Sequence, residues 1–218
     1  MKIIPYSVNT GEINMKIDSD LLDNAIVTNL KEPIFRLYGW KPACISLGKN
    51  QSDKFIDYNV LNKYNIDIVR RITGGRALLH DKELTYSFIT SAENLKNGES
   101  VIESYKEISQ ILIDIFNKLG IPLTLGGESS IHTKFDYCML ISTGADLCYK
   151  GKKFIGSAQC RKQGYILQHG SILLDYNKEL LEELFKEEIS TDSIISLKEI
   201  NPDITLQDII DVVMLLQR

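Results

Sequence analysis

The segment 70–80, which reads Arg-Arg-Ile-Thr-Gly-Gly-Arg-Ala-Leu-Leu-His, concentrates side chains suited to chemistry. Its arginines are Arg70, Arg71 and Arg76. Their forked, permanently charged donors suit a carboxylate, a phosphate or an acyl carbonyl. Gly74 and Gly75 let the backbone turn sharply and approach a ligand without an intervening Cβ. A hairpin turn with solvated arginines explains the same residues, because the spacing matches neither a Walker A loop nor a dinucleotide-binding motif.

A second segment of this kind spans residues 150–174. Lys150-Gly151 and Gln163-Gly164 are typical of tight hairpin turns. Small residues interrupt the strand patterns that flank the second turn, at Gly156, Ser157 and Ala158 and again at His169-Gly170. Such interruptions indicate that another group approaches the backbone, although a plain hairpin with a tight corner is the alternative. Together with the two glycines of the first segment, they predict a groove for a long, thin ligand.

Cys138 is the candidate nucleophile. Lys153 follows fifteen residues later, across a predicted hairpin. An ammonium group beside the thiol would favour the thiolate, which is the form that attacks an acyl carbon. The alternative is that Cys138 is a small buried apolar residue, which is the commoner fate of a cysteine. His80 and His169 are candidate general bases or structural hydrogen-bonding residues.

The remaining cysteines and histidines give no sign of a metal site. Cys44 and Cys148 lie in apolar strand patterns and are expected in the core, whereas Cys160 is expected near the surface. The sequence has no Cys-x-x-Cys pair, and the histidines at positions 80, 132 and 169 lack the spacing of a metal-binding helix. We therefore expect no metal ion and reduced thiols.

The composition is that of an ordinary soluble enzyme. The chain has 218 residues, of which 44% are hydrophobic and 25% charged, enough for one sizeable core. A net charge of −4 argues against nucleic acid as the main partner. Apolar runs stay well short of the roughly 18–20 residues that span a bilayer, and the N-terminus lacks a signal-peptide core. A cytoplasmic, membrane-free monomer is expected.

Hydrophobic periodicity predicts an α/β (α+β) fold, with a mixed, largely antiparallel sheet flanked by helices. Helices are expected over 14–25, 55–64, 100–119, 178–186 and 206–216. Strands are expected over 34–38, 43–47, 66–72 and 77–90, with two or three more within 146–174. Ser100 followed by Glu103 is typical of a capping box at the start of the third helix.

Over roughly residues 10–215, these segments resemble the lipoate–protein ligase, biotin ligase and octanoyltransferase superfamily. The matching motifs are, in chain order, the opening helix (14–18), the first hairpin (35–51), the acyl-pocket motif (70–81), the lysine motif (151–159) and the closing motif (168–174). The resemblance implies a single catalytic domain over residues 1–218, with the class II synthetase-like fold of biotin and lipoate ligases.

Two branches of this superfamily are compared. Lipoate ligases usually have a third glycine where this chain has Arg76, and they form an acyl-adenylate from ATP and Mg²⁺. The cysteine-dependent octanoyltransferases of Gram-positive-type lipoate assembly resemble this chain more closely at Gly-Gly-Arg-Ala and at His80 with the Glu-Leu-Thr-Tyr-Ser run that follows it. Their cysteine precedes the glycine of the Gly-Lys-Lys motif by thirteen residues, as Cys138 precedes Gly151 here. The resemblance implies that Lys153 activates the thiol and holds the acyl carbonyl.

The implied reaction moves an octanoyl group from acyl carrier protein, through a Cys138 thioester, to a lysine of a lipoyl-domain protein. That acceptor would be the glycine-cleavage H protein or a dehydrogenase E2 subunit, and no cofactor is implied. Backbone N–H groups near Gly156 are expected to form an oxyanion hole. The expected substrate-binding residues are Arg70, Arg71, Gly74, Gly75, Arg76, His80, Gly156, Ser157, Ala158, His169 and Gly170.

Four other functions remain open on the sequence. An ATP-dependent lipoate–protein ligase would hold phosphate with the loop between Arg70 and Arg76. A ligase subunit could act with a partner domain on a separate protein. An amidotransferase that moves octanoyl between lipoyl proteins would use the same cysteine chemistry. A non-catalytic module would bind lipoyl domains without turnover.

Overall fold

The computed structural model describes residues 1–127, 137–140, 146–186 and 188–217. Its strands form a larger and a smaller sheet. The larger sheet contains β1 (Lys2–Asn9), β2 (Ile34–Trp40), β6 (Glu83–Ser91), β7 (Thr124–Leu125), β8 (Leu147–Tyr149), β9 (Lys152–Lys162) and β10 (Tyr165–Leu173). The smaller sheet contains β3 (Cys44–Leu47), β4 (Asp67–Arg70) and β5 (Leu78–His80).

The larger sheet has the strand order β1-β2-β6-β10-β9-β8-β7. Only β1 and β2 pair in parallel, because helix α1 (Gly11–Val27) carries the chain back between them. Every other neighbouring pair is antiparallel, so the predicted mixed, largely antiparallel sheet is confirmed. Both predicted hairpin turns are also confirmed, since Lys150-Gly151 and Gln163-Gly164 have positive φ at both residues.

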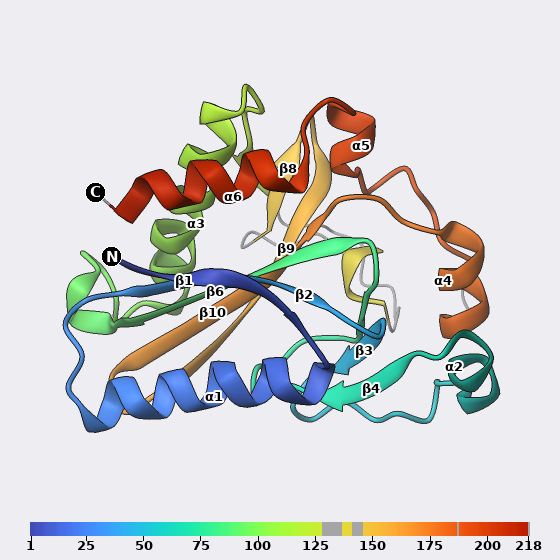
Figure 1. The fold of residues 1–218 in the computed structure, drawn as a ribbon, viewed down its shortest axis with the longest axis horizontal. Coiled ribbons are helices and arrows are strands. Elements are labelled where there is room, and N and C mark those ends of the chain that lie inside the picture. Colours follow the sequence, from blue (N-terminus) through green and yellow to red (C-terminus); the bar gives the residue numbers. More distant parts are fainter. Residues whose placement is uncertain (128–136, 141–145, 187, 218) are drawn as a thin grey trace.

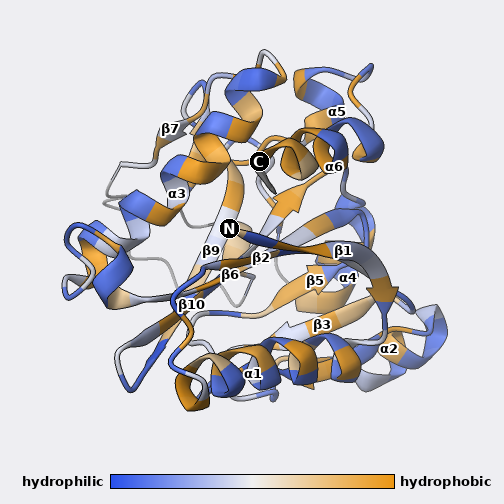
Figure 2. Ribbon diagram, turned by 60° about the vertical axis from the view of Figure 1, so that its left-hand side comes forward, coloured by the Kyte–Doolittle hydropathy of each residue, from blue (hydrophilic) through white to orange (hydrophobic). Residues whose placement is uncertain are grey.

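Helices cover both faces of the larger sheet (Figure 1). Helix α1 lies along one face, and α3 (Val101–Lys118) and α6 (Leu206–Met214) lie on the other. Apolar residues recur along one side of α3 (Figure 2), where Phe116 meets Phe154 of β9 with ring centroids 5.0 Å apart. The shorter helices are α2 (Tyr58–Tyr64), α4 (Lys178–Phe185) and α5 (Leu197–Ile200). No helix in the described ranges has the length and apolar character needed to cross a bilayer.

Helix α1 buries polar as well as apolar residues. Leu22 and Ala25 pack against Ile89 and Leu167 of the sheet. One turn or more nearer its start, Asn14 and Asp18 are equally buried. Buried polar groups need hydrogen-bonding partners. This end of α1 therefore contributes buried hydrogen-bonding side chains rather than apolar packing.

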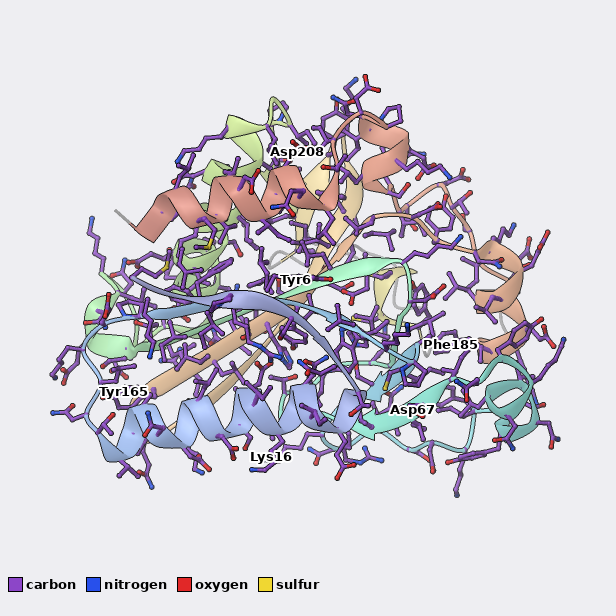
Figure 3. All side chains as sticks on the ribbon, in the orientation of Figure 1. Tyr6, Lys16, Asp67, Tyr165, Phe185 and Asp208 are labelled. Atoms are coloured by element: carbon purple, nitrogen blue, oxygen red, sulfur yellow. The ribbon has the colours of Figure 1, made fainter. Side chains whose placement is uncertain are left out.

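The smaller sheet rests on its own apolar cluster, which includes Tyr137 and Phe185. Phe185 at the end of α4 lies beside this sheet (Figure 3). Its ring stacks on Phe55 with centroids 5.9 Å apart and meets Tyr137 at 4.9 Å. Because Tyr137 immediately precedes Cys138, this packing fixes the residue next to the candidate nucleophile.

One expected hairpin is wrong, and a second hairpin that was weighed only as an alternative does not form either. The predicted first hairpin does not form, because β2 pairs with β1 and β6, whereas β3 pairs with β4 and β5. All four residues of β3 are buried, and both partner strands come later in the chain. Gly74-Gly75 likewise does not close a hairpin, since β4 and β5 lie on opposite sides of β3. Burial between layers, rather than closeness in sequence, decides these pairings.

The capping box expected at α3 is half formed. The Ser100 side chain accepts from the backbone N–H of Glu103. The Glu103 carboxylate contacts Lys106 at 2.8 Å.

Strand β1 and helix α5 were not predicted. Complete capping boxes start α5, at Ser196 and Glu199, and α6.

Candidate active site

A pocket with a cavity volume of about 60 Å³ lies where the two sheets meet. Its walls come from both sheets, from α1, from the loop after β4 and from the 3₁₀ turn η2 (Cys138–Leu140). The lining residues are Met15, Tyr38, Trp40, Ser46, Arg71, Gly75, Leu78, His80, Thr85, Cys138, Gly156, Ser157, Ala158, His169, Gly170 and Ser171.

Most of the residues predicted from the sequence meet at this pocket. They are Arg71, Gly75, His80, Cys138, Gly156, Ser157, Ala158, His169 and Gly170. Lys153 stands directly behind the wall, bonded to Cys138. Arg70, Gly74 and Arg76 are not among the lining residues, and His132 lies outside the described residues. The groove expected from small residues on neighbouring strands therefore corresponds to a real cavity.

The backbone of Cys138 is held from two sides. Its N–H donates to the Ala77 carbonyl at 2.9 Å, and its carbonyl accepts from Lys153 Nζ at 3.1 Å. Tyr137 and Ala77 also form a parallel bridge. The thiol is half-buried in the pocket wall, whereas Cys44 and Cys148 are buried elsewhere, as expected. Cys138 is thus the cysteine that lines the pocket.

Lys153 is a buried cation with a carboxylate partner. Its Nζ lies 3.1 Å from Asp146 Oδ2, and the two side chains are 2% and 3% exposed. A buried ion pair of this kind is costly to break, since either charge alone would be left desolvated. Lys153 bonds to the backbone carbonyl of Cys138 rather than to its sulfur, so the ammonium fixes the turn as well as contributing charge.

Two glycines keep the pocket open. A Cβ at Gly170 would come within 2.4 Å of the Gly156 carbonyl oxygen and 2.7 Å of the Tyr86 ring. A Cβ at Gly156 would come within 2.9 Å of Lys153 Cε. Neither position has room for a side chain beside its present neighbours. The Tyr86 hydroxyl crosses this wall to bond with Ser157 Oγ at 2.7 Å.

The two adjacent arginines donate to the protein itself. Arg70 Nη1 donates to the carbonyl oxygens of Gly48 and Gln51, at 2.7 Å each. Arg71 is buried, and burial lowers the pKa of its guanidinium. Its donors reach backbone carbonyls and hydroxyls of the surrounding loop. In this structure these donors of Arg70 and Arg71 meet protein oxygens, and their expected role in substrate binding stays a prediction.

The backbone at Gly75 makes a close approach, as expected, but it approaches the protein backbone at Gly48 rather than a ligand. Its φ is +95°, and a Cβ on Gly48 would lie 1.8 Å from the Gly75 carbonyl oxygen. The loop after β4 therefore packs directly on the turn after β3.

Asp18 anchors a buried polar cluster that the sequence analysis did not identify. Its carboxylate accepts from Arg36 Nη1 at 2.9 Å, from Tyr38 Oη at 2.8 Å and from Ser87 Oγ at 3.0 Å. His169 Nδ1 lies 3.2 Å away. Burial alone raises the pKa of Asp18, but the bonds and charges of His169 and Arg36 outweigh it and lower that pKa overall. The carboxylate is therefore ionised at neutral pH.

His80 forms a second cluster on the other side of the pocket. Its Nε2 lies 2.8 Å from Ser46 Oγ, and its Nδ1 lies 3.2 Å from Glu83 Oε1. Trp40 stacks on the imidazole with centroids 3.8 Å apart. Burial lowers the pKa of His80, although Glu83 acts in the opposite direction. His80 is thus a neutral, oriented imidazole.

This lowered pKa predicts a pH-dependent stability. Below about pH 6.5, His80 is protonated in the unfolded chain but stays neutral in the folded chain until a lower pH. The unfolded state therefore binds more protons over this range. We expect stability to fall as pH drops through 6.5, with a contribution of at most about 1.4 kcal/mol per pH unit from one such group. Urea midpoints at pH 7.5 and 5.5 would measure it. The His80→Gln variant should show a shallower dependence, and an identical slope would contradict the assignment.

Ser171 is one of the hydroxyl-bearing residues that line the pocket. It is buried, and its Oγ has no hydrogen-bond partner among the described residues. Nothing in a single sequence distinguishes Ser171 from an ordinary strand serine. The sequence likewise gives no signal that Asp18, Arg36 and Asp146 belong to the site. Within the described ranges, His, Cys, Asp and Glu side chains form no group of three that could hold a metal ion.

Comparison with known proteins agrees with this geometry. The octanoyltransferase LipM of Bacillus subtilis (strain 168) is 42% identical over 161 residues, which are 70% of this chain and 58% of that protein. The octanoyltransferase LipM of Clostridioides difficile (strain 630) is 41% identical over 189 residues, 85% of this chain and 69% of that protein. The chain thus spans about three fifths to two thirds of these curated relatives.

Solved structures of the same architecture include a lipoate-protein ligase A bound with ATP. It superposes with a TM-score of 0.75 at 19% identity, covering 97% of this chain and 81% of that one. This likeness confirms the expected ligase-type fold. The family model for the lipoyl protein ligase A/B catalytic domain matches residues 10–215. With that match over nearly the whole chain, the protein belongs to the lipoyl protein ligase A/B catalytic domain family.

Proposed function

We propose that this protein is an octanoyltransferase that carries the acyl group on Cys138. The observation that carries the proposal is the position of this cysteine in the pocket wall, with its backbone N–H held by Ala77 and its carbonyl by Lys153. The names of the curated relatives support the same activity. The proposed donor is octanoyl-acyl carrier protein, and the proposed acceptor is a lysine of a lipoyl-domain protein.

In the first half-reaction, the Cys138 thiolate attacks the thioester carbonyl of the donor. A carbon–sulfur bond to Cys138 forms, the bond to the carrier thiol breaks, and that thiol leaves with a proton. The ammonium of Lys153 and backbone N–H groups near Gly156 stabilise the negative charge on the carbonyl oxygen. The octanoyl tail lies in the pocket between the sheets, where burial contributes about 0.8 kcal/mol per methylene.

In the second half-reaction, the neutral amine of the acceptor lysine attacks the Cys138 thioester. The amide bond forms, the carbon–sulfur bond breaks, and the amine loses a proton as the cysteine is released. His80 and His169 both line the pocket, but each ring nitrogen already has a protein partner. We therefore assign them to orientation of the pocket, in place of the proton transfer expected from the sequence.

The arginines of segment 70–80 favour transfer over adenylation. An acyl-adenylate site needs cationic donors directed at phosphate. Arg70 and Arg71 direct theirs at backbone carbonyls of this chain. An amidotransferase would use the same cysteine and differs only in its acyl donor, so the donor must be tested directly.

The test is the mass of the intact protein after incubation with octanoyl-acyl carrier protein in the absence of ATP. We expect one octanoyl adduct on the wild type, labile to hydroxylamine, and none on Cys138→Ala. Cys160→Ala is the matched control, because Cys160 is also half-buried but does not line the pocket.

Each other outcome has a defined meaning. A wild type without an adduct would rule out transfer from the carrier protein. An octanoylated lipoyl protein should then be supplied as donor, and an adduct from it alone would identify an amidotransferase. An adduct on Cys138→Ala would assign the acyl group to another residue.

A further inference from the structure

Two chains of hydrogen bonds, called here the His169 arm and the His80 arm, run through the buried polar clusters and meet at the side chain of Arg71. In the His169 arm, Asp18 Oδ2 lies 3.2 Å from His169 Nδ1, and His169 Nε2 lies 2.7 Å from Thr73 Oγ1. Thr73 Oγ1 then accepts from Arg71 Nε at 3.1 Å. An ionised carboxylate only accepts, so His169 Nδ1 carries the proton of the bond to Asp18.

The His80 arm repeats this order from the opposite side. Glu83 Oε1 lies 3.2 Å from His80 Nδ1, and His80 Nε2 lies 2.8 Å from Ser46 Oγ. Ser46 Oγ accepts from Arg71 Nη1 at 3.2 Å. Glu83 also accepts from Thr85 Oγ1 at 2.8 Å, as expected of a carboxylate acceptor. Each arm is therefore a carboxylate, a histidine and a hydroxyl that accepts from Arg71.

All five N–H groups of Arg71 are engaged within the protein. Besides the two hydroxyls, Nη1 donates to the Ser46 carbonyl at 2.9 Å. Nη2 donates to the carbonyls of Gly74 and Arg76, at 2.9 and 2.7 Å. A guanidinium has five donors, so none remains for a substrate oxygen unless one of these bonds breaks.

The hydrogen bonds of Arg71 connect it, through the backbone of residues 74–77, to Cys138. Arg71 holds the carbonyls of Gly74 and Arg76, and the next residue, Ala77, accepts the N–H of Cys138 at 2.9 Å. Arg71 and Cys138 both line the pocket. Lys153, by contrast, has its charge offset by Asp146 at 3.1 Å.

We infer that Arg71 is a positioning residue for Cys138, with the two histidine arms holding its guanidinium in a single orientation. The inference builds on the proposed acyl transfer and assigns the positive charge of Arg71 to the architecture of the site rather than to substrate binding. It also explains why both pocket histidines have their second nitrogen turned toward a hydroxyl rather than toward the cavity.

The test compares acylation kinetics of Arg71→Lys with the wild type, using octanoyl-acyl carrier protein. Lysine keeps the charge but has three donors and no fork. We expect kcat for acylation to fall at least thirtyfold while KM changes less than threefold. Arg161→Lys is the matched control, since Arg161 also donates to a serine hydroxyl and a backbone carbonyl, Ser104 and Gly98, away from the pocket. A rise in KM with unchanged kcat would make Arg71 a substrate contact and overturn the inference.

The arms are tested with Thr73 and Ser46. Thr73→Val should lower kcat at least fivefold, Thr73→Ser should restore it, and Ser46→Ala should act like Thr73→Val. In the Arg71→Lys background neither substitution should have a further effect, because the arms act through that guanidinium. Fully additive losses would overturn the inference. Equal rates for Thr73→Val and Thr73→Ser would overturn it even if Arg71→Lys fails to fold.

A substrate-independent measurement separates this inference from the proposed function. The rate of Cys138 alkylation by iodoacetamide, followed by peptide mass, should fall at least fivefold in Thr73→Val and remain at the wild-type value in Thr73→Ser. This holds whether or not the wild type accepts octanoyl from the carrier protein. Unchanged alkylation in Thr73→Val would contradict the coupling between the arm and the cysteine.

Discussion

Replacement of Lys153 with methionine is expected to reduce acyl transfer by at least about a hundredfold, the loss typical of removing one donor from an oxyanion site. Lys153 Nζ bonds to the Cys138 carbonyl and pairs with Asp146, so the change removes a cation and loosens the turn that carries the nucleophile. Rates of octanoyl transfer to a purified lipoyl domain would measure the effect. The loss should appear in kcat, since the pocket proposed to hold the acyl tail is unchanged.

The neighbouring lysine provides the matched control. Lys152 precedes Lys153 on β9, and successive strand residues face opposite sides, so Lys152→Met should leave transfer within about twofold of the wild type. Lys153→Met also strands a buried carboxylate, which costs roughly 3–5 kcal/mol of stability. The double variant Lys153→Met/Asp146→Asn should recover part of that stability but none of the activity. Recovery of activity would show that Lys153 acts only through folding.

Substitution of Asp18 with asparagine should produce a large loss of stability. Asp18 and Arg36 are each 1% exposed and 2.9 Å apart, so the variant leaves a buried guanidinium without its counter-ion. A cost of about 3–5 kcal/mol is expected. For a chain of this size, that lowers the melting temperature by roughly 6–20 °C. Thermal denaturation followed by circular dichroism at pH 7 would measure it.

The same helix supplies a control of the same chemistry. Asp20 pairs with Lys16 at 2.6 Å, but both side chains are exposed, and Lys16 lies on the outer side of α1 (Figure 3). Asp20→Asn should therefore cost at most about 1 kcal/mol. If the two substitutions lower the melting temperature equally, burial of the Asp18–Arg36 pair does not account for its contribution.

Much of the fold could be predicted because local patterns agreed with the final packing. The apolar spacing of α3 and the two turns with positive φ report directly on local backbone geometry. The first hairpin failed because β2 and β3 belong to different sheets. Strand pairing depends on which partners complete a buried layer, and a single sequence does not encode that locally.

The candidate site likewise has features that could be predicted from local sequence and features that could not. Small residues on neighbouring strands and the motif spacing led to the pocket, to Cys138 and to Lys153. The direction of each arginine could not be predicted, because charge and spacing do not reveal whether donors meet a ligand or a backbone carbonyl. Arg70 and Arg71 do the latter.

The sequence by itself determined the family resemblance, the largely antiparallel sheet and the pairing of a cysteine with a lysine across a hairpin. These follow from residue type and spacing, which act over a few residues of chain. Only the tertiary structure joined Asp18 to His169, 151 residues apart, and Ser46 to His80, 34 residues apart. Buried polar groups must find partners wherever the folded chain brings donors and acceptors together, so these networks exist only once the layers have packed.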